Sequence, residues 1–279
     1  MKLITDVHNH SEYSHDCNIP LVEMVEGALK KGVAFYGTSE HFDYDVTIVC
    51  EDPSQSIDEE RYFHDARHVQ EDYAGVINVL VGAELSYCDD PRVIQANAKI
   101  CEKYAPDFIV NSVHTYKGQD YYHKNVFYQT RNGKQVLREK TQVYKEYLQY
   151  IQDSLDVPYP YDIVGHIGYA ARYAPYENRE ITLDQFGSEI DALLKKIIAK
   201  DKILEINGKS KGMQDVFLPS KEIIARYYEL GGRKVSYGAD AHLIEQQLGS
   251  RDEVVRTLKE IGFTYITVPH RGEHIKVEI

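Results

Sequence analysis

The sequence predicts an α/β fold in which short parallel strands alternate with helices around a closed or distorted barrel. Two patterns support this prediction. Short apolar, β-branched runs recur along the 279 residues, and each is followed by a polar turn and then by a segment with helical spacing. Seven or eight such units in one chain are typical of a barrel with right-handed crossovers. An open, doubly wound sheet is the alternative arrangement.

The expected strands are the apolar runs that lie between turn signals. Because each run is followed by a segment with helical spacing, neighbouring strands are expected to be parallel. The runs cover residues 3–7, 34–38, 77–83, 108–113, 162–165, 203–206, 234–238 and 264–268.

Seven helices are expected between these strands. Pro20 favours the start of the first helix, because proline is well accommodated in a first turn, and Gly32 is expected to end it. Gly231 and Gly232 are expected to end the sixth helix in the same way. The helices are expected at residues 20–31, 57–73, 92–104, 136–154, 183–200, 220–230 and 251–261.

Two segments depart from the alternation of strands and helices. Residues 118–134 are rich in Tyr, Gln and Asn and are expected to form an insertion loop after the fourth strand. This loop would be either a lid or wall of a nearby site, or surface decoration. Residues 264–268 and 274–279 flank a polar turn and predict a terminal hairpin near 264–279. We expect residues 1–279 to form a single domain.

Composition narrows the class of function. The formal net charge of −12 disfavours nucleic acid as the main partner, because binding to a phosphate backbone needs a basic surface. The first residues lack a signal peptide, and no run approaches the ~18 apolar residues of a membrane span. The four cysteines are scattered, as is typical of reduced thiols. We therefore expect a cytoplasmic protein without a membrane partner, and the sequence does not predict its oligomeric state.

Histidines and carboxylates follow the expected strands in a regular way. Each lies at or just past the carboxyl end of a strand, and in a parallel barrel these ends meet at one mouth. In chain order the residues at these positions are His8, His10, His15, His41, Glu84, His114, His166, Asp240 and His242.

These residue types indicate a site for several divalent cations. Neutral imidazoles and carboxylates are good ligands for zinc, manganese and iron, and without cations such a cluster would suffer desolvation and mutual repulsion. His8 and His10 lie two residues apart, so both rings can reach one ion, and Asp240 and His242 repeat the spacing. Glu84 has two oxygens with which it can bridge two ions.

Other titratable residues carry weaker signals. Asp6 is expected to orient one of the imidazoles. His64 and His68 are spaced to bind zinc on one helix face, but their charged neighbours favour a solvated surface. His123, His270 and His274 are also expected at the surface. The chain has no G-x-S-x-G, P-loop or G-x-G-x-x-G motif, which disfavours a serine hydrolase, a kinase or a dinucleotide-binding enzyme.

The motifs, taken in order, resemble those of the PHP (polymerase and histidinol phosphatase) superfamily. The resemblance extends from the first strand to residue 242 and fills all nine expected ligand positions. The chain is most similar to monofunctional histidinol-phosphate phosphatases, in its length, in H-I-G-Y-A-A-R-Y at 166–173 and in L-E-I-N at 204–207. The superfamily motifs are D-V-H-N-H (6–10), His15, S-E-H (39–41), G-A-E (82–84), N-S-V-H (111–114), V-G-H (164–166) and G-A-D-A-H (238–242).

The resemblance implies a distorted (β/α)7 TIM-like barrel with three metal ions, either zinc or, as alternatives, manganese or iron. It also implies that Arg172 grips the substrate phosphate. Similar phosphatases have an arginine after L-E-I-N; here the sequence is G-K-S-K-G, so that Lys209 or Lys211 would serve instead. The implied ligand sets are His8, His10, Glu84 and Asp240 for the first ion, Glu84, His114 and His166 for the second, and His15, His41 and His242 for the third.

The implied reaction is hydrolysis of L-histidinol phosphate, a small phosphorylated metabolite, to L-histidinol and phosphate in histidine biosynthesis. Arg172 would neutralise the phosphoryl oxygens, and Asp240 or His242 would assist the leaving alkoxide. A phosphotyrosine phosphatase or another small-molecule phosphatase would use the same metals. A nuclease is disfavoured by the acidic charge, and a non-catalytic metal-binding module by the complete ligand set. An amidohydrolase would normally show a lysine where this chain has Val113 and His114.

Overall fold

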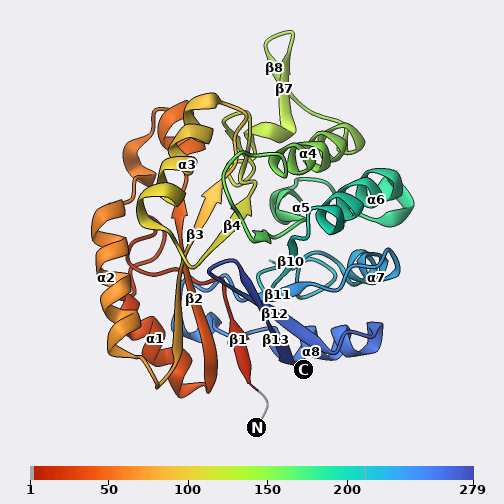
Figure 1. The fold of residues 1–279 in the computed structure, drawn as a ribbon. Helices are drawn as coiled ribbons and strands as arrows, with labels where there is room; N and C mark the ends of the chain where they lie inside the picture. Colours follow the sequence, from red (N-terminus) through yellow and green to blue (C-terminus); the bar gives the residue numbers. More distant parts are fainter. Residues whose placement is uncertain (1–2, 211) are drawn as a thin grey trace.

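The computed structural model describes residues 3–210 and 212–279 and contains one sheet of seven parallel strands (Figure 1). The order of the strands in the sheet is their order along the chain, so each crossover joins spatial neighbours. The strands are β1 (Ile4–Asp6), β2 (Val33–Phe42), β3 (Asn78–Ser86), β4 (Phe108–Ser112), β9 (Ile163–Val164), β10 (Ile203–Asn207) and β11 (Val235–Gly238).

The sheet curls until its first and last strands meet. The Val7 amide donates to the Tyr237 carbonyl at 3.1 Å, and the His10 amide donates to the Ala241 carbonyl at 2.9 Å. On the opposite side the pairing is sparse, because the two-residue strand β9 is the only link between β4 and β10 in the strand order. The predicted barrel is therefore confirmed, with its distortion located at β9.

Helices cover the outside of this barrel (Figure 1). Seven of them correspond to the expected ones, and the short α5 was not predicted. They are α1 (Leu21–Lys30), α2 (Glu59–Asp72), α3 (Pro91–Tyr104), α4 (Lys140–Ser154), α5 (Tyr169–Tyr173), α6 (Leu183–Ala199), α7 (Lys221–Glu229) and α8 (Arg251–Ile261). Short turns of helix also lie in the loops, among them η1 (Asp45–Val49), η2 (Pro53–Gln55) and η4 (Ile244–Gln246). No helix in the described part of the chain is both long and apolar enough to cross a membrane.

Local sequence sets the limits of these helices. Asp90 accepts a hydrogen bond from the Arg92 amide at 2.8 Å and so caps the start of α3. Gly32 follows α1 with a φ of 77°, a conformation that glycine adopts without a steric penalty. The predicted start of the fourth helix at residue 136 is wrong. Val136 belongs to an exposed strand, and the helix begins only at Lys140.

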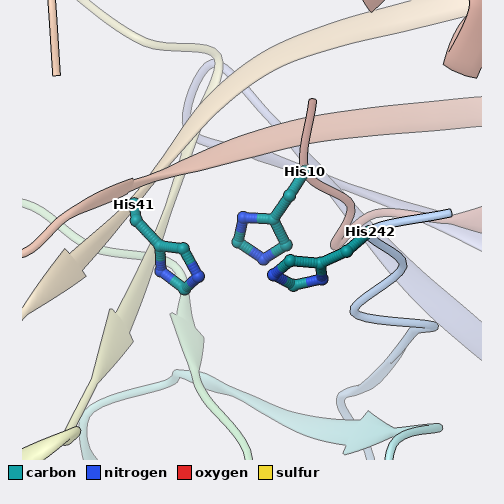
Figure 2. A group of neighbouring side chains, drawn as sticks. All are labelled: His10, His41 and His242. Carbon is teal, nitrogen blue, oxygen red and sulfur yellow. The ribbon is translucent and has the colours of Figure 1, made fainter. Parts of the chain in front are cut away.

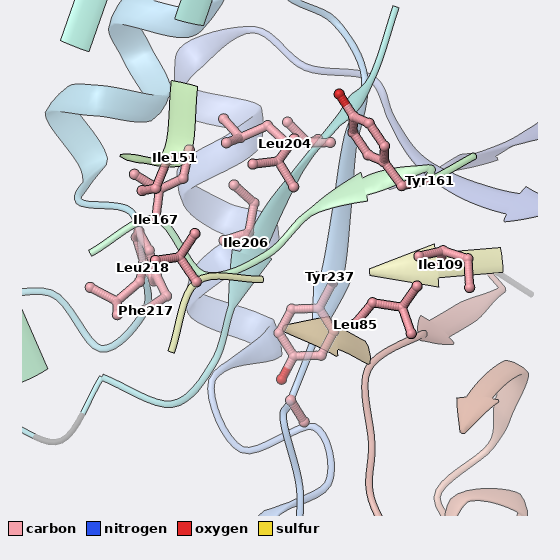
Figure 3. Packing of buried hydrophobic residues seen from close by; sticks show 14 of the residues in the cluster. Leu85, Ile109, Ile151, Tyr161, Ile167, Leu204, Ile206, Phe217, Leu218 and Tyr237 are labelled. Atoms are coloured by element: carbon pink, nitrogen blue, oxygen red, sulfur yellow. The ribbon is translucent and has the colours of Figure 1, made fainter. Parts of the chain in front are cut away.

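Two apolar clusters stabilise the barrel. The larger one lies between the helices and the outer face of the sheet, and Figure 3 shows part of it, including Leu204 and Ile206 of β10. The smaller one includes Leu80 and Phe108 and occupies the barrel interior. A side chain at Gly82 would place its Cβ 2.4 Å from the Phe108 ring, so the absence of a side chain at Gly82 makes room for that ring.

The chain ends in an antiparallel pair, β12 (Tyr265–His270) and β13 (Glu273–Glu278), that closes the amino end of the barrel. Val268 and Val277 of this pair pack into the inner cluster. Arg271 Nε donates to Asp107 Oδ1 at 2.7 Å and so ties the pair to the start of β4. The opposite end of the barrel, where the strands point their carboxyl ends, is left for a site.

The segment after β4 forms two small hairpins. β5 (Thr115–Tyr116) pairs with β6 (Gln119–Asp120), and after η3 (Asn125–Phe127) β7 (Tyr128–Arg131) pairs with β8 (Lys134–Leu137). The β7–β8 hairpin projects away from the barrel (Figure 1), whereas β5–β6 stays beside the strand ends.

Replacing Phe108 with alanine should lower the free energy of unfolding by about 3–5 kcal/mol, because the ring is buried inside the barrel and its loss leaves a cavity. Chemical denaturation would measure this change. Val76→Ala is the matched control, since Val76 is 62% exposed and its truncation should change stability by less than about 0.5 kcal/mol. Equal effects of the two substitutions would contradict the interior packing described here.

Candidate metal centre

The nine histidines and carboxylates predicted as ligands gather at the carboxyl ends of the barrel strands. Strands β2 and β3 are longer than expected. His41 and Glu84 therefore lie in the last residues of these strands rather than after them. A cavity of about 420 Å³ opens there. His8 and His10 lie beneath it, fully buried, and contact the Glu84 carboxylate from below. The remaining predicted ligands line the cavity: His15, His41, Glu84, His114, His166, Asp240 and His242.

Glu84 is the centre of this arrangement. Its carboxylate is 1% exposed and faces imidazoles from four different strand ends. Burial alone disfavours the charged carboxylate, yet His8 and His114 hold the pKa of Glu84 well below its usual value. The facing nitrogens are His8 Nε2 (3.4 Å), His10 Nε2 (3.7 Å) and His41 Nδ1 (2.9 Å) at Oε2, and His114 Nε2 (3.2 Å) and His166 Nε2 (2.7 Å) at Oε1.

A second group of imidazoles adjoins the first. Figure 2 shows His10 between His41 and His242, with ring centroids 4.1 Å and 4.2 Å apart. Asp240 Oδ1 lies 3.4 Å from His10 Nε2 and joins this group to the Glu84 cluster. His15 lies further out at the mouth, exposed, with its ring centroid 5.5 Å from that of His41.

The donor atoms fit divalent cations. His114 Nε2 and His166 Nε2 approach to 3.2 Å, a separation close to the ~3.3 Å edge expected for two nitrogens on one tetrahedral zinc. His8 Nε2, His10 Nε2 and Glu84 Oε2 are buried and have no hydrogen-bond partner among the described residues, although all three point at one another. Buried polar atoms are normally paired, so these atoms fit a shared ion. Three donor groups have the required geometry: His8, His10 and Glu84; His41, Glu84 and His114; and His10, His41 and His242.

Hydrogen bonds fix which nitrogen of each ring faces the centre. His8 Nδ1 donates to Glu205 Oε1 at 2.5 Å, and His114 Nδ1 donates to Asp43 Oδ1 at 3.0 Å. His10 Nδ1 donates to Ser14 Oγ at 3.1 Å. Because Nδ1 carries the proton in each case, the lone pair of Nε2 is left to bind a cation.

The second oxygen of Glu205 also supports the floor of the site. It accepts a hydrogen bond from the His166 amide at 2.5 Å. Glu205 therefore joins a ligand that follows β1 to the backbone of a ligand that follows β9, and its side chain is 1% exposed.

The local electrostatics differ from one imidazole to the next. Burial and the rings of His41 and His242 hold the pKa of His10 well below its usual value. Burial acts in the same direction at His41, but the carboxylates of Asp43 and Glu84 outweigh it and raise the pKa of His41 to about 9. The cluster therefore mixes neutral and protonated rings, and a bound cation would replace the protons.

Two cationic side chains lie over Asp240. Arg172 is buried and places Nη1 3.3 Å from Asp240 Oδ2, while its Nη2 donates to Asn207 Oδ1 at 2.6 Å. Lys209 Nζ lies 3.5 Å from Asp240 Oδ1. Both cations line the cavity, as expected for groups that meet an anion there. Lys211, the other lysine considered for this role, lies outside the described residues.

Several details differ from the sequence-based expectations. Asp6 Oδ1 accepts hydrogen bonds from the Ala239 amide and the Asn9 side chain, and Glu205 rather than Asp6 orients an imidazole. Glu205 is a glutamate inside the apolar strand β10, and this unusual position was the sequence signal that could have indicated its role. Asp43, two residues after His41, was also missed.

Of the five histidines predicted to lie at the surface, three are exposed, and His270 and His274 are partly buried. His64 and His68 lie on α2 with ring centroids 4.3 Å apart, away from the residues that line the cavity. His123 is exposed as well, but it stands at the cavity mouth and forms part of its wall.

Comparisons with known proteins agree with this geometry. The family model described as the PHP domain matches residues 6–209. A probable histidinol-phosphatase of Clostridium acetobutylicum is 28% identical over 240 residues, covering 86% of this chain and 87% of that protein. A histidinol-phosphatase of Lactococcus lactis is 25% identical over 258 residues, covering 92% of this chain and 91% of that protein.

The fold is shared with a solved structure. The crystal structure of the histidinol phosphate phosphatase from Lactococcus lactis, complexed with zinc, L-histidinol and phosphate, superposes with a TM-score of 0.83 at 22% identity. The match covers 98% of this chain and 99% of that one.

Glu205→Gln should weaken zinc binding by about 10- to 100-fold, because the amide cannot accept the His8 proton as strongly and leaves the ring less well oriented. Competition with a chromogenic chelator would measure the affinity. Glu260→Gln, on the exposed face of α8, is the matched control and should bind zinc as the unaltered protein does. Unchanged affinity in Glu205→Gln would show that this contact does not support the site.

Zinc binding to the metal-free protein should release protons near pH 7, because His41, with its pKa raised to about 9, must lose its proton to become a ligand. The released fraction should fall as the pH rises through about 9, where the free protein already holds His41 neutral. Calorimetric titrations in two buffers of different ionisation enthalpy would count the protons. A proton count independent of pH across this range would contradict the prediction.

Proposed function

The chain belongs to the PHP domain family, and we propose on this basis that it hydrolyses L-histidinol phosphate to L-histidinol and phosphate in histidine biosynthesis, as a metal-dependent phosphomonoesterase. The observation that carries this proposal is the meeting of a buried imidazole–carboxylate cluster and two cationic side chains, Arg172 and Lys209, in one cavity. The names of the relatives from Clostridium acetobutylicum and Lactococcus lactis support the substrate. Their near-complete coverage supports transfer of the whole activity.

We propose that three divalent cations bind at the mouth, most naturally zinc, with manganese or iron accepted by the same donors. The residues of the converging donor groups all belong to the proposed ligand sets: His8, His10, His41, Glu84, His114 and His242. His8, His10, Glu84 and Asp240 would hold the first ion, Glu84, His114 and His166 the second, and His15, His41 and His242 the third. The position of His10 between His41 and His242 indicates that the first and third ions would be neighbours.

Cations bound there would supply Lewis acidity and lower the pKa of water to near neutrality. The remaining steps depend on side chains of this chain. Arg172, held by Asn207 and Asp240, would meet two phosphoryl oxygens with its planar guanidinium. Lys209 would add a single mobile charge from the other side of Asp240. Together they would neutralise the charge that builds up on the phosphoryl group during hydrolysis.

The leaving alkoxide needs a proton or a cation, and His242 and Asp240 are the groups placed to assist it. The pKa of Asp240 lies well below its usual value: burial opposes ionisation, but Lys209, His10 and Arg172 outweigh it. Asp240 is therefore an anion that would bind a cation and orient Arg172 and Lys209. It is a poor source of a proton. His242, whose Nδ1 lies 3.1 Å from Lys209 Nζ, would be a ligand of the third ion and would therefore act by holding that cation rather than by giving up a proton.

We also propose a cytoplasmic location. The four cysteines are unpaired thiols in the structure, two of them buried, and this agrees with a reducing compartment. The substrate is a small metabolite, and the acidic net charge of −12 gives no support for a nucleic-acid partner.

Purified protein should release inorganic phosphate from L-histidinol phosphate and should lose this activity after treatment with a chelator. His10→Ala and Asp240→Asn should each lower kcat by at least about 100-fold, because each removes a donor that cannot be replaced by a neighbour. A colorimetric phosphate assay would measure both effects.

His64→Ala provides the matched control, since it removes an exposed imidazole of α2 and should leave the rate unchanged. Activity should return when zinc or manganese is added to the chelated protein. Full activity in the presence of chelator, or in His10→Ala, would exclude the proposed role of the metal centre.

A further inference from the structure

The cavity wall contains a carboxylate that the proposed reaction does not use. Asp120 lies on β6, where its backbone pairs with Thr115, the residue after the ligand His114. Register therefore places Asp120 next to the metal centre although it is not one of the converging donors. Its side chain lines the cavity.

Asp120 is held in place by the backbone, and its interactions with positive groups are with imidazoles. One oxygen accepts a hydrogen bond from the Tyr122 amide at 2.5 Å. In the described part of the chain it makes no ion pair with a lysine or arginine, whereas Asp240 is close to both Arg172 and Lys209. Burial raises the pKa of Asp120, and the Tyr122 amide and the neighbouring His114 and His123 oppose this effect only in part.

Tyrosine rings continue the wall from Asp120 down to the floor. Tyr122 stands at the mouth, 54% exposed, and packs edge-on against Tyr173 with centroids 5.2 Å apart. Tyr173 contacts Tyr169 at 5.1 Å, and Tyr169 in turn lies 5.1 Å from the ring of His166. We call Tyr122, Tyr169 and Tyr173 the aromatic wall. Such faces attract flat rings and cations.

The lining of the cavity thus offers three kinds of contact. Its floor would bind cations, Arg172 and Lys209 suit a phosphate, and Asp120 adds a carboxylate beside the aromatic wall, whose Tyr169 also packs against Arg172. A phosphomonoester whose phosphate reaches the floor would turn the rest of its structure toward the carboxylate and the rings. A positive group of the substrate close to the ester carbon would form an ion pair with Asp120.

We propose that Asp120 binds the protonated amino group of the substrate and that the aromatic wall packs against its ring, so that the enzyme selects phosphate esters of amino alcohols. This inference rests on the proposed function and deepens it. In L-histidinol phosphate the amino group is on the carbon next to the one that bears the ester oxygen, and the imidazole lies beyond it. Asp120 is then a specificity-determining residue rather than a catalytic one.

A panel of three substrates tests the two contacts separately. L-Histidinol phosphate has both the amino group and the ring, its deamino analogue keeps only the ring, and phosphoethanolamine keeps only the amino group. Asp120→Asn should lower kcat/KM for L-histidinol phosphate by about 10- to 100-fold, mainly through KM, and leave the deamino analogue within about threefold. Tyr122→Leu should instead weaken turnover of the two ring-bearing compounds and spare phosphoethanolamine.

Asparagine keeps the oxygen that accepts the Tyr122 amide, so the β5–β6 hairpin should persist. Zinc content and thermal unfolding of Asp120→Asn should match those of the unaltered protein. Asp52→Asn is the matched control: Asp52 is an exposed acid, it caps η2, and it does not line the cavity. It should change none of the three rates.

The outcomes distinguish failure of the proposed role of Asp120 from failure of the proposed phosphatase function. Equal losses on the amino and deamino substrates, or no loss on either, would overturn the role of Asp120. A protein that hydrolyses none of the three compounds would instead contradict the proposed function. In that case binding of L-histidinol and of its deamino analogue, measured by calorimetry on the zinc-loaded protein and on Asp120→Asn, still decides the subsite. Asp120→Asn must weaken only the amine for the proposal to stand.

Discussion

The carboxylate of Glu84 is the contact on which the rest of the mouth depends. A buried anion and a set of buried imidazoles are each unfavourable alone, so neither can be placed without the other. The pairing of β2 with β3 sets His41 directly opposite Glu84, and the pairing of β3 with β4 aligns Glu84 with Val110. A slip of one residue would turn Glu84 to the other face of the sheet and disperse the cluster. The barrel register and the charge balance therefore constrain each other.

Much of this arrangement was predictable because strand ends and ligand types are local features of the chain. Apolar runs mark the strands, and a histidine or acid just after each run marks the mouth, as at His114 and His166. The partners of these ligands were not predictable. Glu205 lies far from His8 in sequence, and only the closing of the barrel between β1 and β11 brings β10 near β1.

Elements that are weak in sequence terms were missed for a related reason. β7 and β8 expose both faces, so no apolar alternation marks them, and the prediction that a helix begins at Val136 is wrong. The helix α5 has five residues and is fixed by tertiary contacts rather than by its own periodicity. Both elements belong to the surroundings of the cavity, where the chain departs from the regular alternation of strands and helices. Sequence periodicity thus predicted the barrel strands and the ligands at their ends better than the segments that form the walls of the cavity.

Strain and charge meet at Asp240. Its φ of 54° lies in the left-handed region, which costs an ordinary residue about 1 kcal/mol or more, although aspartate tolerates it better than most. The same residue draws Arg172 and Lys209 together, and its amide donates to the His8 carbonyl at 2.8 Å across the seam of the barrel. One strained residue thus serves the closure of the fold and the placing of its two cationic groups.

The terminal pair β12–β13 limits how a ligand can enter and leave the cavity. By sealing the amino end of the barrel with Val268, Val277 and the clasp between Arg271 and Asp107, it leaves the cavity with a dead end. A substrate and its products would therefore pass through the same opening, at the carboxyl ends of the strands. A product bound at the floor would therefore leave after a product bound nearer the opening.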